Sequence, residues 1–191
     1  EMIRDPSRLP RIVSAIQEIH AIDPGTTDRL QHFSPFEVAH KYLDIADRKG
    51  LALPAHCDHN LANKVHELQN KVRTCTPTFT HNDMMPGNFL DTGHRIWVID
   101  WEYSGTGHPL FDLAGLSSNC DFDDKLDQQL TSMYGLSDAA LAEFRIMKAM
   151  AALRESLWAV VQGAQSAISF DYNAYRDDNY NKFITYELAA R

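Results

Sequence analysis

Three polar side chains near the middle of the chain are of the types that phosphoryl transfer requires. Asp83 and Asn88 lie in the segment 81–88, which reads His-Asn-Asp-Met-Met-Pro-Gly-Asn, and Asp100 follows an apolar run. A carboxylate beside an attacking hydroxyl can accept its proton, and carboxylate and amide oxygens are ligands that magnesium accepts. The spacing therefore predicts Asp83 as a general base and Asn88 and Asp100 as magnesium ligands of a phosphotransferase.

Each of these residues also has a purely structural interpretation. A single aspartate in such a loop commonly serves a turn or a helix cap, but three suitable residues in the required order favour chemistry at Asp83. His81 is expected to orient the loop by a hydrogen bond to backbone rather than to carry a proton. Gly87 is expected to permit a left-handed turn between the two reactive side chains.

The elements that must position this loop begin with helices. Apolar residues recur at helical spacing from Leu9 to Ile19. Ser34, Pro35 and Glu37 form a capping box that opens a second helix, which ends near Gly50. A third helix is expected from about residue 58.

The chain changes character after residue 77. Residues 78–80 are β-prone, and residues 88–90 with 95–99 predict a hairpin around an Asp-Thr-Gly turn, whose apolar second strand is expected to be buried. Gly105-Thr106-Gly107 is expected to be a loop, because it lacks the strand-to-helix context of a phosphate-binding motif.

Helical signals return from Asp112 onward. A long apolar helix is expected over about 139–164 and a final helix over about 177–190. The expected fold class is mainly α with a small β-ribbon (α+β), in a single domain spanning 1–191. Within it, 1–77 form a helical part, 78–118 hold the catalytic loop, hairpin and metal site, and 119–191 form a helical substrate-pocket part.

Composition and charge limit the kinds of partner. The 191 residues are 44% hydrophobic, which is enough for one core with an appended helical part. The 26 acidic and 18 basic residues give a net charge of -8, which disfavours nucleic acid and anionic membranes and suits a small cationic substrate.

Metal, disulfide and membrane signals are weak. Cys57, Cys75 and Cys120 show no paired spacing, so no disulfide framework is indicated. His56 and His59 lie close to Cys57 but lack a second pair of ligands, so no zinc site is indicated either. No apolar run is long enough to span a bilayer and no signal peptide is recognised, so a cytoplasmic location is expected.

The motifs resemble the choline/ethanolamine kinase family, within the wider aminoglycoside phosphotransferase-like and protein-kinase-like fold. The resemblance is close over residues 78–118, where Ile-Asp-Trp-Glu-Tyr at 99–103 and Phe-Asp-Leu-Ala at 111–114 follow the catalytic segment. A weaker match runs through residues 157–162 and 170–175.

The resemblance implies roles residue by residue. It makes Asp83 the catalytic base, Asn88 and Asp100 the ligands of Mg²⁺, and Asp112 a brace for the catalytic loop, with ATP as co-substrate. The reaction implied is transfer of the γ-phosphoryl group to the hydroxyl of choline, ethanolamine or a similar amino alcohol.

A substrate pocket is also implied. Glu102, Tyr103, Trp158, Tyr172 and Tyr175 fall where the family builds its quaternary-ammonium pocket, and an aromatic face attracts a desolvated cation by roughly 0.5 to 2 kcal/mol. For Trp158, on an apolar helix, packing in the core is the alternative.

The sequence departs from the family in one place in this pocket. Choline kinases often carry a second tryptophan three residues before the Trp158 position, and Glu155 stands there instead. A carboxylate at this point would still favour an amine. An aminoglycoside, thiamine or another small alcohol is the alternative acceptor.

The family's nucleotide lobe has no counterpart in the motifs of residues 1–77. These residues contain no Gly-rich strand-turn-strand and no apolar strand ending in lysine. The chain is therefore expected to be a C-terminal lobe. It is either a fragment of a longer parent chain that carries the partner lobe, or a lobe that works without its own nucleotide-binding lobe. Alone, it is expected to fold, to lack kinase activity and to self-associate through a strip beside the hairpin. The other hypothesis is an inactive cation-binding module.

Overall fold

The computed structural model describes residues 2–25 and 30–190, and most of them are helical. The α-helices are α1 (Leu9–His20), α2 (Pro35–Lys49), α3 (Leu61–Gln69), α4 (Pro109–Asn119), α5 (Asp124–Tyr134), α6 (Asp138–Gly163) and α7 (Tyr172–Ala189). Two 3-10 turns, η1 (Met2–Arg4) and η2 (Pro86–Asn88), accompany them. The prediction for α6 is confirmed within a residue. The final helix begins five residues earlier than predicted, because the Asp171 side chain caps it by accepting from the N–H of Ala174.

Helix α2 shows how local sequence sets these boundaries. The Ser34 hydroxyl accepts from the N–H of Glu37 at 3.4 Å, and Gly50 ends the helix in a left-handed conformation with φ 61°. A glycine adopts that conformation without the steric penalty of a side chain. The predicted start and end of this helix are confirmed.

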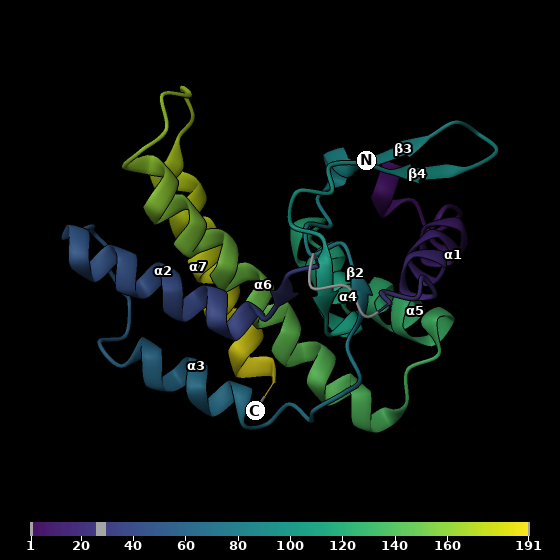
Figure 1. Ribbon diagram of the computed structural model, residues 1–191, viewed down its shortest axis with the longest axis horizontal. Coiled ribbons are helices and arrows are strands. Elements are labelled where there is room, and N and C mark those ends of the chain that lie inside the picture. The colour runs from purple at the N-terminus through teal and green to yellow at the C-terminus, as the bar shows by residue number, and fades with distance from the viewer. Residues whose placement is uncertain (1, 26–29, 191) are drawn as a thin grey trace.

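Helix α6 is the axis of the helical core. It packs against α7, α4 and α2, and Figure 1 shows it running through the middle of the molecule with α7 beside it. Nearly every residue from Ile146 to Val161 is buried, including Lys148, Arg154 and Glu155. Buried charges need partners, and those of Arg154 belong to the candidate site described below.

Two small sheets accompany the helices. The first has the order β1-β5-β2, built from β1 (His32–Phe33), β5 (Gly105–Gly107) and β2 (Thr78–Thr80); β5 pairs parallel to β1 and antiparallel to β2. The prediction of a loop at residues 105–107 is therefore wrong, because these residues form the central strand. Close backbone approach explains the glycine: a Cβ on Gly105 would stand 2.2 Å from the carbonyl oxygen of Gln31.

The second sheet is the predicted hairpin, formed by β3 (Phe89–Asp91) and β4 (Ile96–Val98) in antiparallel register. Its turn contains Gly93 with φ 84°. The carboxylate of Asp91 pairs with Arg8 and Arg11, which fastens the hairpin to α1. The two elements lie side by side in Figure 1.

The hairpin has one apolar face turned to the outside. Phe89 and Ile96 are buried, whereas Leu90, Trp97 and Ile99 are 48%, 51% and 42% exposed. The prediction that the whole run 96–99 is buried is therefore wrong, since successive strand residues point to opposite faces. None of the helices in the described ranges is both long and apolar enough to cross a membrane.

Candidate active site

The loop that carries Asp83 is fixed by hydrogen bonds to the side chain of Asp112. Asp112 lies in the first turn of α4, and its carboxylate accepts the backbone N–H of His81 at 2.9 Å and that of Asn82 at 2.7 Å. Its side chain is fully buried. Bonds between backbone N–H groups and a carboxylate are charge-assisted and strong, so they fix the loop at the residues before Asp83.

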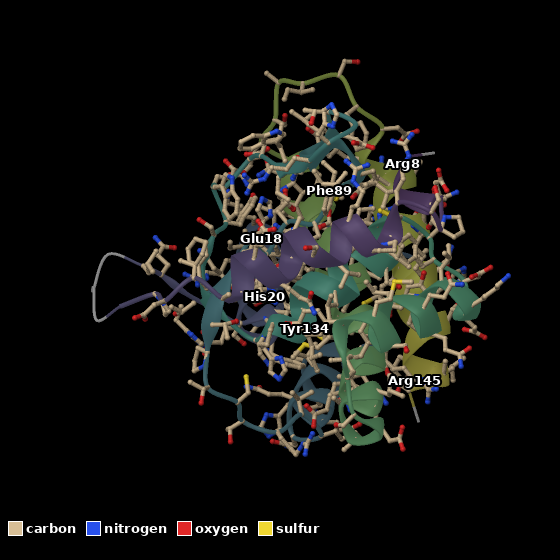
Figure 2. The ribbon with its side chains drawn as sticks, turned by 90° about the vertical axis from the view of Figure 1, so that its right-hand side faces the viewer. Arg8, Glu18, His20, Phe89, Tyr134 and Arg145 are labelled. Atoms are coloured by element: carbon tan, nitrogen blue, oxygen red, sulfur yellow. The ribbon has the colours of Figure 1, made fainter. Side chains whose placement is uncertain are left out.

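His20 supports Asp112 from α1, a contact that no sequence motif indicates. Its Nε2 lies 2.9 Å from Oδ2 of Asp112, the oxygen that also accepts the N–H of His81, and its Nδ1 lies 2.7 Å from the hydroxyl of Tyr134 on α5. Figure 2 shows His20 and Tyr134 next to each other beneath α1. The catalytic loop is therefore connected through Asp112 to two further helices. A lone histidine near the end of an amphipathic helix carries no signal for this role.

His81 connects the loop to the end of β4. Its Nδ1 accepts the backbone N–H of Asp83 at 3.2 Å, and its Nε2 lies 2.9 Å from the carbonyl oxygen of Ile99. Because one ring nitrogen accepts, the other carries the proton and donates to that carbonyl. The ring also meets Trp101 edge-on at 4.7 Å. Both nitrogens are occupied by backbone partners, which is the orienting arrangement.

The same connection brings Asp100 beside Asn88. The backbone N–H of Ile99 donates to the carbonyl of Asn88 at 2.9 Å, so the residue that follows Ile99 lies next to the catalytic segment. The Asn88 amide nitrogen donates to the carbonyl of Asp83 at 2.8 Å and to its Oδ2 at 3.3 Å. The predicted base and both predicted metal ligands are thus brought together.

Left-handed backbone occurs at Asn82 and Asp100 and not at Gly87. Their φ angles are 65° and 68°, and Gly87 has no positive φ. The prediction of a left-handed turn at Gly87 is wrong. Left-handed backbone at residues other than glycine costs of order 1 kcal/mol and persists where surrounding contacts impose it. Here the hydrogen bonds of Asn82 to the carbonyls of Thr80 and Tyr103 hold the first of these residues.

The oxygen atoms left at this site fit magnesium. Asn88 uses its amide nitrogen on Asp83, which leaves its Oδ1 as the atom for a ligand. Asp100 is exposed, and within residues 2–25 and 30–190 its carboxylate forms no ion pair or hydrogen bond with another residue. Mg²⁺ is typically held by one or two protein oxygens, with water and substrate phosphates completing the octahedron.

Asp83 has a second partner that sequence reasoning missed. Arg154 on α6 donates from Nη1 to Asp83 Oδ1 at 2.9 Å, and the same nitrogen contacts Glu155. Its guanidinium carbon lies 4.6 Å from the ring centre of Tyr103. No motif in the sequence pairs residues that lie 71 positions apart.

Three of the predicted substrate-binding residues form one aromatic group. Trp158 lies 6.0 Å from Tyr172 and 6.1 Å from Tyr175 between ring centres. Phe170, which was not predicted, meets Tyr172 at 5.0 Å and Tyr175 at 5.5 Å. The Tyr175 hydroxyl donates to Glu155 at 2.8 Å, and burial followed by this carboxylate raises the pKa of Tyr175.

The other two predicted residues face a different hollow. Glu102 and Tyr103 line a cavity of about 340 Å³ together with Tyr42 and Arg154. Tyr175 lines a separate cavity of about 570 Å³, which also reaches Met85 of the catalytic loop. The five residues therefore do not surround a single pocket. Asp83, Arg154 and Glu155 connect the two sides.

The chain is similar to known phosphotransferases in sequence and in fold. The protein LicA of Haemophilus influenzae is 34% identical over 88 residues, covering 43% of this chain and 31% of that protein. The structure of a choline/ethanolamine kinase family protein from Mesorhizobium loti superposes with a TM-score of 0.84 at 28% identity, covering 97% of this chain and 65% of that one. Choline kinase LicA from Streptococcus pneumoniae gives a TM-score of 0.79 at 24% identity, covering 96% of this chain and 64% of that one.

The chain thus spans about a third of the curated relative and just under two thirds of the solved structures. The sequence profile of the phosphotransferase enzyme family (APH) matches residues 4–147, which include the catalytic loop, the hairpin and α4. Asp112 fixes the loop, and the loop brings Asp83 together with Asn88 and Asp100. With this match, we conclude that the chain belongs to the phosphotransferase enzyme family.

Proposed function

We propose that the chain is the acceptor- and metal-binding part of a kinase that transfers the γ-phosphoryl group of ATP to the hydroxyl of choline or a similar small amino alcohol. The observation that carries the proposal is the grouping around Asn88, whose amide nitrogen is bonded to Asp83 and whose backbone carbonyl accepts the N–H of Ile99, the residue before Asp100. A carboxylate for the hydroxyl and two oxygens for magnesium are what this reaction needs.

Asp83 would orient the acceptor hydroxyl and accept its proton. General-base assistance of this kind contributes roughly 10² to 10⁴ in rate. The remaining work is positioning and charge stabilisation, because the transferred phosphoryl group needs little covalent help. Bound Mg²⁺, held by Asn88 and Asp100, would neutralise charge on the phosphates.

The exposed face of the hairpin supports a place for the nucleotide. Leu90 and Ile99 are 48% and 42% exposed and lie close in sequence to Asn88 and Asp100 respectively. An apolar surface beside a phosphate-binding metal suits the adenine ring of ATP, since a nucleobase presents a flat face of low polarity.

Charge and aromatic side chains support a cationic acceptor. The chain carries a net charge of -8. Trp158, Tyr172 and Tyr175 form an aromatic group, which the hydrogen bonds of Glu155 and Arg154 connect to Asp83. Glu102 is exposed and offers a carboxylate. A desolvated ammonium gains roughly 0.5 to 2 kcal/mol from such a face. An aminoglycoside, thiamine or another small alcohol is the alternative acceptor.

A substrate screen tests the proposal. The full-length polypeptide that carries residues 1–191 is incubated with ATP, Mg²⁺ and separately choline, ethanolamine, an aminoglycoside and thiamine, and phosphorylated product is measured. Choline or ethanolamine should be the preferred acceptor. Phosphorylation of only the other alcohols would reject the substrate and keep the reaction class, and no product with any alcohol would reject both.

The second candidate is a binding module that retains the cation site without turnover. It is favoured by the lack of a Gly-rich strand-turn-strand in residues 1–77. Calorimetry of this chain distinguishes the two. Binding of choline without measurable binding of ATP and Mg²⁺ supports the module, whereas micromolar affinity for ATP contradicts it.

A further inference from the structure

We propose that Arg154 is a positioning residue, which holds the carboxylate of Asp83 in its reactive orientation and ties it to the aromatic side of the acceptor site. This inference rests on the proposed function, because it assigns a role within the same site. Its starting point is one nitrogen atom: Nη1 of Arg154 donates to Asp83 Oδ1 at 2.9 Å and also contacts Oε1 of Glu155.

The burial of these groups makes the contact a fixed one. The side chains of Arg154, Asp83 and Glu155 are 4%, 14% and 7% exposed. An arginine is almost never buried to this degree unless it is paired. Burial alone lowers the pKa of Arg154, but the carboxylates of Glu155 and Asp83 outweigh burial and raise it, so the guanidinium stays charged.

The guanidinium also lies over an aromatic ring. Its central carbon lies 4.6 Å from the centre of the Tyr103 ring, a distance at which a cation is attracted to an aromatic face. Two carboxylates and one ring therefore determine where Arg154 points its donors. A lysine at this position would supply the charge without the planar guanidinium that lies over this ring.

Glu155 extends the arrangement toward α7. One of its oxygens contacts Arg154, and the other accepts the hydroxyl of Tyr175 at 2.8 Å. With both oxygens engaged by protein, Glu155 serves to hold Arg154 and Tyr175 rather than to face a ligand. Tyr175 in turn packs against Trp158 at 6.1 Å.

The result is a continuous connection from the aromatic group through Tyr175, Glu155 and Arg154 to Asp83. Helix α6 supplies the two central residues, and it is among the most buried elements of the molecule. A base placed from such a helix keeps its orientation while the catalytic loop binds metal. Misplacing a reacting group by about 1 Å can cost on the order of a hundredfold in rate.

The test compares Arg154→Lys with a matched change, Arg145→Lys, which replaces an exposed arginine on the same helix (Figure 2). In the full-length protein, Arg154→Lys should lower kcat by about ten- to a hundredfold while the KM values for alcohol and ATP stay within about threefold. Arg145→Lys should leave kcat within about twofold. A kcat for Arg154→Lys within about twofold of wild type overturns the proposal.

A double-mutant cycle separates positioning from a general structural effect. If Arg154 acts through Asp83, Arg154→Lys should have almost no further effect on kcat in an Asp83→Asn background. An equal loss in both backgrounds overturns the proposal.

Two further measurements test the proposal if the Arg154→Lys variant does not fold or if the wild-type protein shows no kinase activity. If Arg154→Lys does not fold, the pair Arg154→Met with Glu155→Met replaces the buried pair by apolar side chains, a replacement that proteins often tolerate, and the same loss of kcat is expected. If the wild-type protein phosphorylates no alcohol, the proposed function fails, and a crystal structure of Arg154→Lys then decides the positioning claim alone. The Asp83 carboxylate should move, and oxygens within about 0.5 Å of their original place overturn the claim.

Discussion

The carboxylate of Asp83 receives a donor on each oxygen and still has room for a substrate. Arg154 donates to Oδ1, and the Asn88 amide donates to Oδ2 at 3.3 Å. An ionised carboxylate offers about four lone-pair sites, so a hydroxyl can approach while both existing bonds remain. At the scale of single residues, the site therefore consists of an oriented carboxylate, the proposed base, close to the two residues proposed as metal ligands.

Replacing Asp83 by asparagine should lower kcat by at least about a hundredfold, which is about 2.7 kcal/mol of transition-state stabilisation. Substrate affinity should change little, because the group acts chiefly in the transition state. Steady-state kinetics of the full-length protein give both quantities. Asp47→Asn, an exposed position on α2, is the control. A variant within tenfold of wild type would remove Asp83 from the role of base.

Asp100→Ala should act differently from Asp83→Asn, because it removes a proposed metal ligand. The Mg²⁺ concentration needed for half-maximal rate should rise by about tenfold or more, the range in which changes around a metal site usually fall. The rate at saturating metal should recover in part. A magnesium titration checks this, and an unchanged half-maximal concentration would argue against Asp100 as a ligand.

At the scale of elements, the close approach of β5 to residue 31 places a strict demand on one glycine. A Cβ on Gly105 would stand 2.2 Å from the Gln31 carbonyl oxygen, whereas a Cβ on Gly87 would meet nothing within 4 Å. Gly105→Ala should therefore destabilise the fold by about 1 to 3 kcal/mol. Gly87→Ala should stay within about 0.5 kcal/mol. Urea unfolding measures both, and equal effects would contradict the position of β5.

The elements that the sequence predicts well are those with a local signal. Amphipathic periodicity and capping residues indicate α1 and α2, and the apolar strands around a turn indicate the hairpin. Strand β5 was missed because three small residues show no alternation. The proposed base and oxygen ligands were predicted from spacing within one loop and the next strand, and those assignments stay predictions.

Other parts of the site have no local signal. His20 and Asp112 lie 92 positions apart, and Asp83 and Arg154 lie 71 apart, so only the packing of α1, α4 and α6 brings them together. A buried arginine within an apolar helix reads in the sequence as an interruption. The structure shows that its charge has two carboxylate partners, Asp83 in the loop and Glu155 on the same helix.

At the scale of the whole molecule, the apolar face of the hairpin is the feature that should govern association. Leu90 and Trp97 are register partners on this face, and both are about half exposed. Contiguous exposed apolar surface favours contact with other molecules. Residues 1–191 should therefore show an average mass that rises with concentration in sedimentation velocity, and Trp97→Lys should reduce the rise.

Ile168→Lys provides the control for that experiment. Ile168 is 72% exposed in the segment between α6 and α7, so it tests whether any exposed apolar residue drives association. Only the hairpin change should matter. A wild-type chain that remains monomeric at all concentrations, or an equal effect of both substitutions, would contradict the assignment.

The polypeptide of residues 1–191 should fold cooperatively and show no kinase activity. A continuous core that runs from α1 to α7 supports folding. The chain offers a proposed base, two proposed metal ligands and one apolar face, but residues 2–25 and 30–77 contain no Gly-rich strand-turn-strand and no apolar strand ending in lysine to hold phosphates. Positioning and electrostatics supply nearly all the catalysis of phosphoryl transfer, so rates should remain at background. Thermal unfolding and a coupled ATP assay test both halves, and robust ATP-dependent phosphorylation of any small alcohol would show that the helical first third holds the nucleotide itself.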